Sequence, residues 1–160
     1  MESMEGFRRL NDLQISDCLV GDLPEVLEIE NSSFDCPYPF SLFQKLFSTR
    51  GTIFRVSRID GKVVGYCVTA RKDDITFTIV SLAVSRSFRR LGIGLRLLND
   101  SIQLLAEKNR IKVVELQVSV QNKAAVSLYL GRGFERAGII RRYYENGDDA
   151  LVMRYTLGKL

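Results

Sequence analysis

The chain has 160 residues, of which 46% are hydrophobic, 26% charged and 9% aromatic, a composition typical of one folded domain with its own core. It contains no histidine, which excludes a Ser-His-Asp triad, a Cys-His pair, a histidine-ligated metal and a histidine general base. Lysine and arginine number 23 against 19 acidic residues, a net charge of +4, which permits an anionic ligand without requiring one. We expect a single domain over residues 1–160.

The cysteines are Cys18, Cys36 and Cys67, and none has the Cys-x-x-Cys spacing of a zinc site. We therefore expect reduced thiols and no bound metal. No run of about 18 apolar residues occurs, and residues 1–12 are charged and lack the apolar centre of a secretory signal. These features predict a cytoplasmic protein without a membrane segment.

The first half of the chain predicts two helices and four strands. Asp22 with Glu25 three residues later is typical of a helix start, and Asp60-Gly61 between two β-branched runs is typical of a hairpin. The expected elements are a strand over 13–18, helices over 22–31 and 41–47, and strands over 53–59, 62–70 and 75–84. The loop over 33–40 contains two of the three prolines and several aromatic residues, which makes it a candidate binding wall.

The second half begins with a long amphipathic helix that we expect to reach Asn109. Its apolar face repeats at spacings of three and four residues, at Leu91, Gly94, Leu95, Leu98, Ile102 and Leu105. A strand over 113–120, a helix over 122–132 and a hairpin of strands over 134–144 and 150–157 follow. The strand, helix and strand from 75 to 120 require a right-handed parallel crossover.

These elements together predict an α/β fold. Its sheet is mixed and mostly antiparallel, with one parallel central joint and flanking helices. A ligand crevice is expected at such a joint.

The most specific motif is Arg89-Arg90-Leu91-Gly92-Ile93-Gly94, between the strand over 75–84 and the long helix. The glycines allow the backbone to approach a ligand, the helix start offers free N–H groups, and the arginines add positive charge. A packing role for the glycines, with solvated arginines, is the alternative. The motif is neither G-x-G-x-x-G nor a Walker loop, which disfavours a dehydrogenase or a kinase. It predicts a diphosphate site.

Five motifs surround this site: Ser81-Leu82-Ala83-Val84, Arg89-x-x-Gly92-x-Gly94, Leu116 to Val118, Asn122-x-x-Ala125-x-x-Leu128-Tyr129 and Gly133-Phe134. Their order resembles the GNAT superfamily of acetyl-CoA-dependent N-acetyltransferases across nearly the whole chain. Two more motifs are Phe34-x-x-Pro37-Tyr38 and Tyr143-Tyr144-x-x-Gly147-x-Asp149-Ala150. They resemble the RimI-like branch, with its archaeal and eukaryotic counterparts, that acetylates protein N-termini.

The resemblance implies a GNAT fold, acetyl-CoA as cosubstrate, and a role for each motif. The residues implied to hold the cofactor are Leu82, Ala83 and Val84 along the pantetheine, Arg89, Arg90, Leu91, Gly92, Ile93 and Gly94 around the diphosphate, and Asn122 and Tyr129 at the thioester. Tyr129 would also give the departing thiolate a proton, although the residues alone favour a core-packed aromatic. The implied substrate residues are Phe34, Asp35, Tyr38, Tyr143 and Tyr144.

Gln117 departs from the family pattern, because many relatives place a glutamate or a histidine at this position to help deprotonate the amine. An amide cannot act as a base, although it can orient a water or a peptide group. We therefore expect Gln117 to orient a water or a peptide group and not to accept a proton. The proton would pass along water to Asp35, to another carboxylate such as Glu30, or to a tyrosine. This loss favours an N-terminal α-amine as substrate, since a lysine amine is harder to deprotonate.

The expected reaction is direct transfer of the acetyl group from acetyl-CoA to the α-amino group of a protein, a ribosomal protein among the candidates. Two alternatives stay open: an enzyme of the same fold that acetylates a small amine, and a silent acyl-CoA-binding or interaction module. No RNA-binding signature with interleaved aromatics is present, so no direct nucleic-acid partner is expected. The expected state is a monomer or a weak homodimer.

Overall fold

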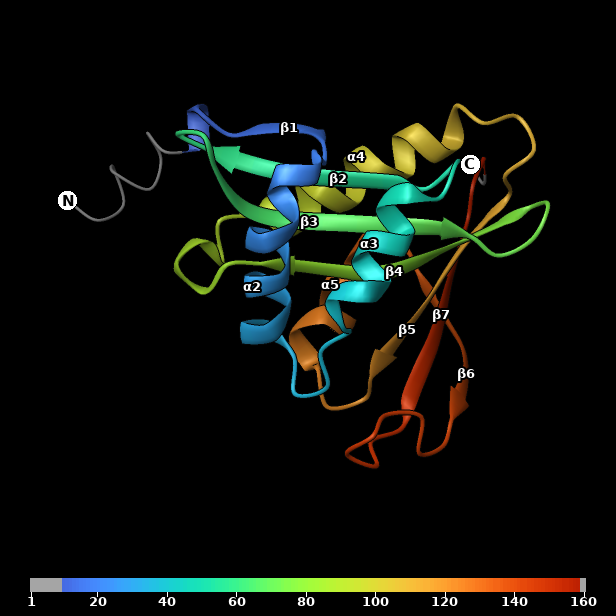
Figure 1. Cartoon of the computed structure of the whole chain (residues 1–160). Helices are drawn as coiled ribbons and strands as arrows, with labels where there is room; N and C mark the ends of the chain where they lie inside the picture. Colours follow the sequence, from blue (N-terminus) through green and yellow to red (C-terminus); the bar gives the residue numbers. More distant parts are fainter. Residues whose placement is uncertain (1–9, 159–160) are drawn as a thin grey trace.

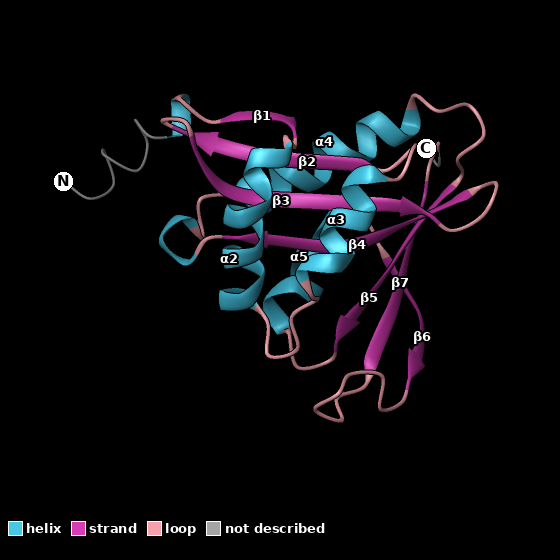
Figure 2. Ribbon diagram, in the orientation of Figure 1, coloured by secondary structure: helices cyan, strands magenta, loops and turns pink. Residues whose placement is uncertain are grey.

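Seven strands form one sheet in the order β1-β2-β3-β4-β5-β7-β6 (Figures 1 and 2). The computed structural model describes residues 10–158. The strands are β1 (Gln14–Asp17), β2 (Ile53–Ile59), β3 (Lys62–Arg71), β4 (Thr76–Val84), β5 (Val113–Ser119), β6 (Glu135–Ile140) and β7 (Ala150–Thr156). The helices are α2 (Leu23–Ser33), α3 (Phe40–Ser48), α4 (Ile93–Ala106) and α5 (Lys123–Arg132), with 3-10 turns η1 (Val20–Asp22) and η2 (Arg86–Phe88).

The sheet is antiparallel except where β4 meets β5. That pair is parallel, and α4 makes the crossover between the two strands. Parallel strands need such a long connection, whereas antiparallel strands can be joined by a short hairpin. The predicted α/β class with one parallel central joint is confirmed.

Helices cover both faces of the sheet (Figure 1). The sheet therefore divides the core in two. One apolar cluster joins α2 and α3 to the sheet around Phe43 and Tyr66. The other joins α4 and α5 to the opposite face around Leu97 and Tyr129. Gly65 on β3 allows α4 to pack closely, since a Cβ there would lie 3.0 Å from the Cδ1 of Leu97.

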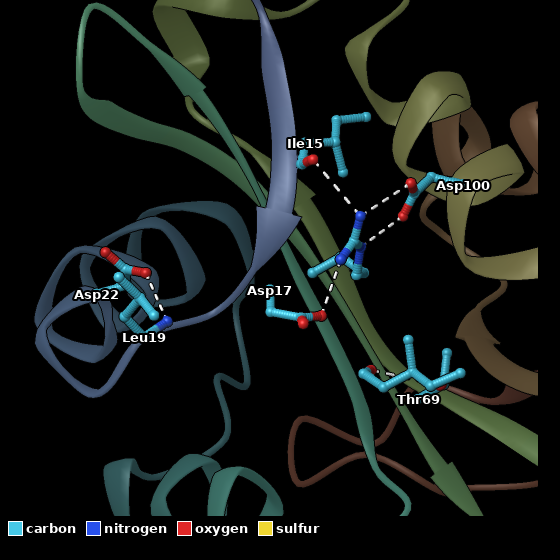
Figure 3. A network of polar contacts seen from close by, with 8 residues as sticks. Ile15, Asp17, Leu19, Asp22, Thr69 and Asp100 are labelled. Carbon is cyan, nitrogen blue, oxygen red and sulfur yellow. Dashed lines mark hydrogen bonds and ion pairs between the residues drawn. The ribbon is translucent and has the colours of Figure 1, made fainter. Parts of the chain in front are cut away.

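A half-buried arginine joins α4 to β1 and β2. The Arg55 guanidinium on β2 donates to both carboxylate oxygens of Asp100 on α4, at 2.8 and 3.2 Å. It also donates to Asp17 on β1 at 2.8 Å (Figure 3). Charge-assisted hydrogen bonds of this kind are stronger than neutral ones. The helix that begins at the glycine motif is therefore held from β1 and β2.

Two predicted boundaries are wrong, and one predicted cap residue lacks its side-chain hydrogen bond. The strand expected to reach Tyr144 ends at Ile140, because Arg142 adopts a left-handed φ of 50° and its N–H donates to Asp149. Helix α4 ends at Ala106, three residues before the expected position. Asp22 is the N-cap residue of α2 as predicted, but its side chain makes no capping hydrogen bond; its carboxylate accepts the N–H of Leu19 at 2.7 Å and pairs with Arg58.

Candidate active site

The site begins where β4 and β5 separate. Their pairing runs from Thr76 and Val113 to Ile79 and Leu116, but β4 continues to Val84 and β5 to Ser119. Figure 2 shows the two strands diverging beyond that point. The main-chain groups of the last residues of β4 therefore have no ladder partner on β5 and can bind a ligand.

A β-bulge marks the start of this separation. Val68 on β3 pairs with Ser81, whereas Thr69 pairs with Ile79, so Val80 is an extra residue on β4. Bulges redirect side chains and are frequent beside active sites. Here the bulge lies beside the end of the β4–β5 ladder.

A cleft of about 290 Å³ opens at this separation. Its walls come from the end of α2 and the loop after it, from residues 79–82 on β4 and 116–119 on β5, from the start of α5, and from the loop between β6 and β7. Segments that lie far apart in the sequence thus surround one space. Its volume is near the lower end of the range typical of ligand-binding pockets.

The glycine motif leads into α4 at one end of β4. Gly92 is the N-cap of α4, with a left-handed φ of 78° and no side-chain cap, so the first N–H groups of the helix keep their donor capacity. A Cβ at Gly92 would meet no atom within 4 Å, which leaves the approach open. Open space, unpaired N–H donors and the positive end of a helix dipole fit a diphosphate.

The side chain of Arg89 has protein partners in this structure. Its Nε donates to the carbonyl of Val84 at 2.8 Å, and its Nη2 donates to the Ser33 hydroxyl at 3.0 Å. Ser33 lies at the end of α2 and lines the cleft. Arg89 therefore joins the glycine loop to the helix that carries one wall of the cleft.

Tyr129 belongs both to the core and to the cleft. It is 6% exposed, lines the cleft and packs its ring against Phe134 at a centroid distance of 5.5 Å. Burial raises the pKa of the Tyr129 phenol above its ordinary value, so the hydroxyl keeps its proton at neutral pH and can donate it. Asn122 caps the same helix by accepting the N–H of Ala125 at 3.2 Å and also lines the cleft.

Gln117 lies on the cleft wall with its amide oriented by Glu115. The Gln117 Nε2 donates to Glu115 at 3.3 Å, and Glu115 also pairs with Lys72 at 2.6 Å and Arg154 at 2.7 Å. Burial alone would raise the pKa of Glu115, but the hydrogen bonds from its two cations lower it. Glu115 thus stays ionised between its two cations, and it does not line the cleft.

Two loops bring the predicted substrate residues together. Phe34, Asp35, Tyr38 and Tyr144 all line the cleft. Burial and the nearby Tyr143 and Glu30 raise the pKa of Tyr38 to about 12, so its phenol is neutral.

Tyr143 does not line the cleft and is 43% exposed. Its ring lies 5.0 Å from that of Tyr144, at right angles. Both tyrosines lie in the loop after β6, and of the two only Tyr144 contributes to the cleft wall.

Glu30 is a cleft residue that the sequence pattern suggested only as one of several possible proton acceptors. It is 1% exposed and lines the cleft. A sequence signal exists: Glu30 falls on the apolar face of α2 with Val26 and Ile29, both buried. A charged residue on such a face needs polar partners.

Three further findings concern metals, thiols and membrane segments in the described part of the chain. Residues 10–158 contain no group of three or more His, Cys, Asp or Glu side chains that could hold a metal. Cys18, Cys36 and Cys67 are free thiols. No helix within those residues is long and apolar enough to cross a membrane.

A sheet split at its parallel joint, beside a helix that begins at a glycine, is the arrangement implied by the resemblance to acyltransferases that use acetyl-CoA. A model of the acetyltransferase (GNAT) family matches residues 23–134. An N-alpha-acetyltransferase of Sulfolobus acidocaldarius is 30% identical over 172 aligned positions, covering 98% of this chain and 100% of the relative.

Solved structures agree with this assignment. The ribosomal-protein-S18-alanine N-acetyltransferase from Escherichia coli has a TM-score of 0.83 at 27% identity, over 92% of this chain and 96% of that one. NAA60 of Arabidopsis thaliana in complex with acetyl-CoA shares the fold, with a TM-score of 0.82 at 18% identity, over 92% of this chain and 99% of that one.

The chain therefore belongs to the acetyltransferase (GNAT) family. The predicted family and branch, and the predicted class of acetyl-CoA-dependent N-acetyltransferase, are confirmed.

Proposed function

We propose that this enzyme transfers the acetyl group of acetyl-CoA directly to the α-amino group of a protein N-terminus. The observation that carries the proposal is the cleft itself, which starts at the separated strands and ends between two aromatic loops that bear Tyr38 and Tyr144. An extended chain end can enter between such loops and meet the thioester. The names of the archaeal and E. coli relatives, an N-alpha-acetyltransferase and a ribosomal-protein-alanine acetyltransferase, support an α-amine.

Each end of the cofactor has a proposed place in the chain. The N–H groups of Gly92, Ile93 and Gly94 hold the diphosphate, with charge from Arg90, and the main chain of Leu82 to Val84 lies along the pantetheine. The bound cofactor supplies the thioester whose acetyl carbon is attacked. Unpaired N–H groups of β4 stabilise the negative charge that develops on the thioester oxygen, a contribution of about 3 to 4 kcal/mol per donor in other enzymes.

Tyr129 and Gln117 complete the proposed machinery. The phenol of Tyr129, which burial keeps protonated at neutral pH, gives its proton to the sulfur as the C–S bond breaks. Gln117, held by Glu115, orients water or a substrate peptide group. None of the cysteines belongs to the motif positions, so we propose a ternary complex without an acyl-enzyme.

The chemistry of the amine favours an N-terminus over a lysine. An α-amine with a pKa of about 7.7 to 8.0 costs about 1 to 1.4 kcal/mol to deprotonate at pH 7, whereas a lysine amine near 10.4 costs about 4.6. An enzyme with glutamine at the usual base position therefore loses less with α-amines. The free thiols of the three cysteines further fit a reducing compartment, and we place the enzyme in the cytoplasm.

A peptide panel tests the proposed function. Peptides with varied first and second residues are compared with the same peptides carrying a blocked N-terminus and one free lysine, with intact mass as readout. We expect acetylation of free N-termini at a kcat/KM at least 100-fold above that of the lysine peptides. A lysine-only activity, activity on small amines alone, or binding of acetyl-CoA without turnover would each contradict the proposal.

A further inference from the structure

The buried carboxylate of Glu30 lies between β4 and the loop before α3. Glu30 accepts the main-chain N–H of Tyr38 through Oε1 at 3.1 Å and the Ser81 hydroxyl through Oε2 at 2.7 Å. The Tyr66 hydroxyl also donates to Oε2. Glu30 thus joins α2 to the loop before α3, to β3, and to β4 directly beside the bulge at Val80.

The three groups that donate hydrogen bonds to Glu30 are all uncharged. Burial and the nearby Glu30 raise the pKa of Tyr66 well above its ordinary value, so Tyr66 stays protonated and donates. Within residues 10–158, no lysine or arginine forms an ion pair with Glu30, in contrast to Glu115 with its two cations. The cleft therefore keeps a carboxylate whose charge no protein cation cancels.

The other two carboxylates on the described cleft wall are placed less favourably. Asp35 is exposed, so water screens its charge. Asp148 lies in the loop between β6 and β7 and accepts the Ser119 hydroxyl at 3.2 Å and the Asn146 amide at 3.1 Å. Glu30 alone among the three is buried.

Glu30 also keeps one free acceptor position. A carboxylate offers about four lone-pair sites, and the three donors use two on Oε2 and one on Oε1. The unused site is on Oε1, and the residue lines the cleft. A substrate ammonium or one bridging water can occupy that site.

We propose that Glu30 is the proton acceptor for the substrate's α-ammonium group, an inference that rests on the proposed function. One proton passes from the nitrogen to Glu30, directly or through one water, and frees the lone pair. The nitrogen then bonds to the acetyl carbon as the C–S bond breaks, and Tyr129 protonates the sulfur. The second proton of the nitrogen restores Tyr129 through water, and Glu30 releases its proton to solvent.

The pH dependence of kcat/KM tests this role with Glu30→Gln, which removes the charge. The wild type binds the ammonium form of the substrate's α-amine, so its kcat/KM at pH 6.5 should stay within about threefold of the value at pH 8. The variant can use only the free amine, so its kcat/KM should fall tenfold per pH unit below the amine pKa of about 7.7 to 8.0. At pH 6.5 we expect a loss of about 15- to 30-fold, the factor by which the free amine is depleted, and at pH 9 a much smaller one.

Glu25→Gln is the matched control. Glu25 lies on the same helix and also accepts a main-chain N–H, that of Val63 at 3.1 Å, but it does not line the cleft. This variant should keep the wild-type pH profile. Peptide affinity in the presence of coenzyme A gives a second readout, and we expect about tenfold weaker binding with Glu30→Gln only.

Two further variants separate proton transfer from support of the loop. Ser81→Ala and Tyr66→Phe each remove one donor to Glu30 and keep its charge, so both should lower kcat/KM without moving the acid side of the profile towards the amine pKa. Loss of activity in all three variants with an unchanged pH profile would overturn the proposal and leave Glu30 a structural role.

The wild-type profile decides the matter even if Glu30→Gln does not fold. An acid side that follows the pKa of each peptide's own amine would overturn the role of Glu30. Failure of the wild type to acetylate any α-amine at any pH would overturn the proposed function instead, so the two outcomes are distinguishable.

Discussion

Tyr129 shows how one residue can serve the core and the reaction. Its ring packs on Phe134, so Tyr129→Phe should keep the packing and remove only the hydroxyl. We expect kcat to fall on the order of 100-fold, with the Kd for acetyl-CoA and the Tm nearly unchanged. Steady-state kinetics, calorimetry and thermal unfolding measure these three quantities.

Tyr155→Phe is the control for that change. Tyr155 also packs on Phe134, at a centroid distance of 5.4 Å, and does not line the cleft. It should retain wild-type kcat. Equal rates for Tyr129→Phe and the wild type would show that the phenol does not protonate the leaving sulfur.

At the scale of elements, the proposed diphosphate site at the start of α4 predicts that a negative charge placed there weakens coenzyme A binding. Asparagine and aspartate both tolerate the left-handed backbone of Gly92 better than other residues, and both would enter the open space before the helix. Gly92→Asn should weaken coenzyme A binding about tenfold, and Gly92→Asp at least tenfold more, because its carboxylate repels the diphosphate.

Calorimetry at low and high salt checks this pair. The difference between the two variants should shrink as salt rises, since screening weakens the repulsion. Equal affinities at low salt would place the diphosphate elsewhere. Thermal unfolding of both variants controls for the fold.

The elements also show which boundaries the sequence could predict. The hairpin at Asp60-Gly61 forms as expected, because its turn chemistry is local. The end of β6 was not predictable from local pattern, since it depends on the Arg142 backbone and its bond to Asp149. Tertiary contacts set such ends, and periodicity does not report them.

At the scale of the whole molecule, the one parallel joint across the long helix followed from connection rules and was confirmed. The separation of β4 from β5 was not predictable from residue pattern alone, because it depends on register and on the bulge at Val80. Glu30 was only one of several options in the sequence, since its burial and its bonds to Tyr66 and Ser81 join segments up to 51 residues apart.

The most direct test of the account is the affinity of a conjugate that links coenzyme A through an acetyl group to the α-amine of a short peptide. The separated strands and the two loops predict that it binds at least 100-fold more tightly than coenzyme A alone, and that the same conjugate built on a lysine side chain does not. An α-linked conjugate that binds no better than coenzyme A would contradict the account.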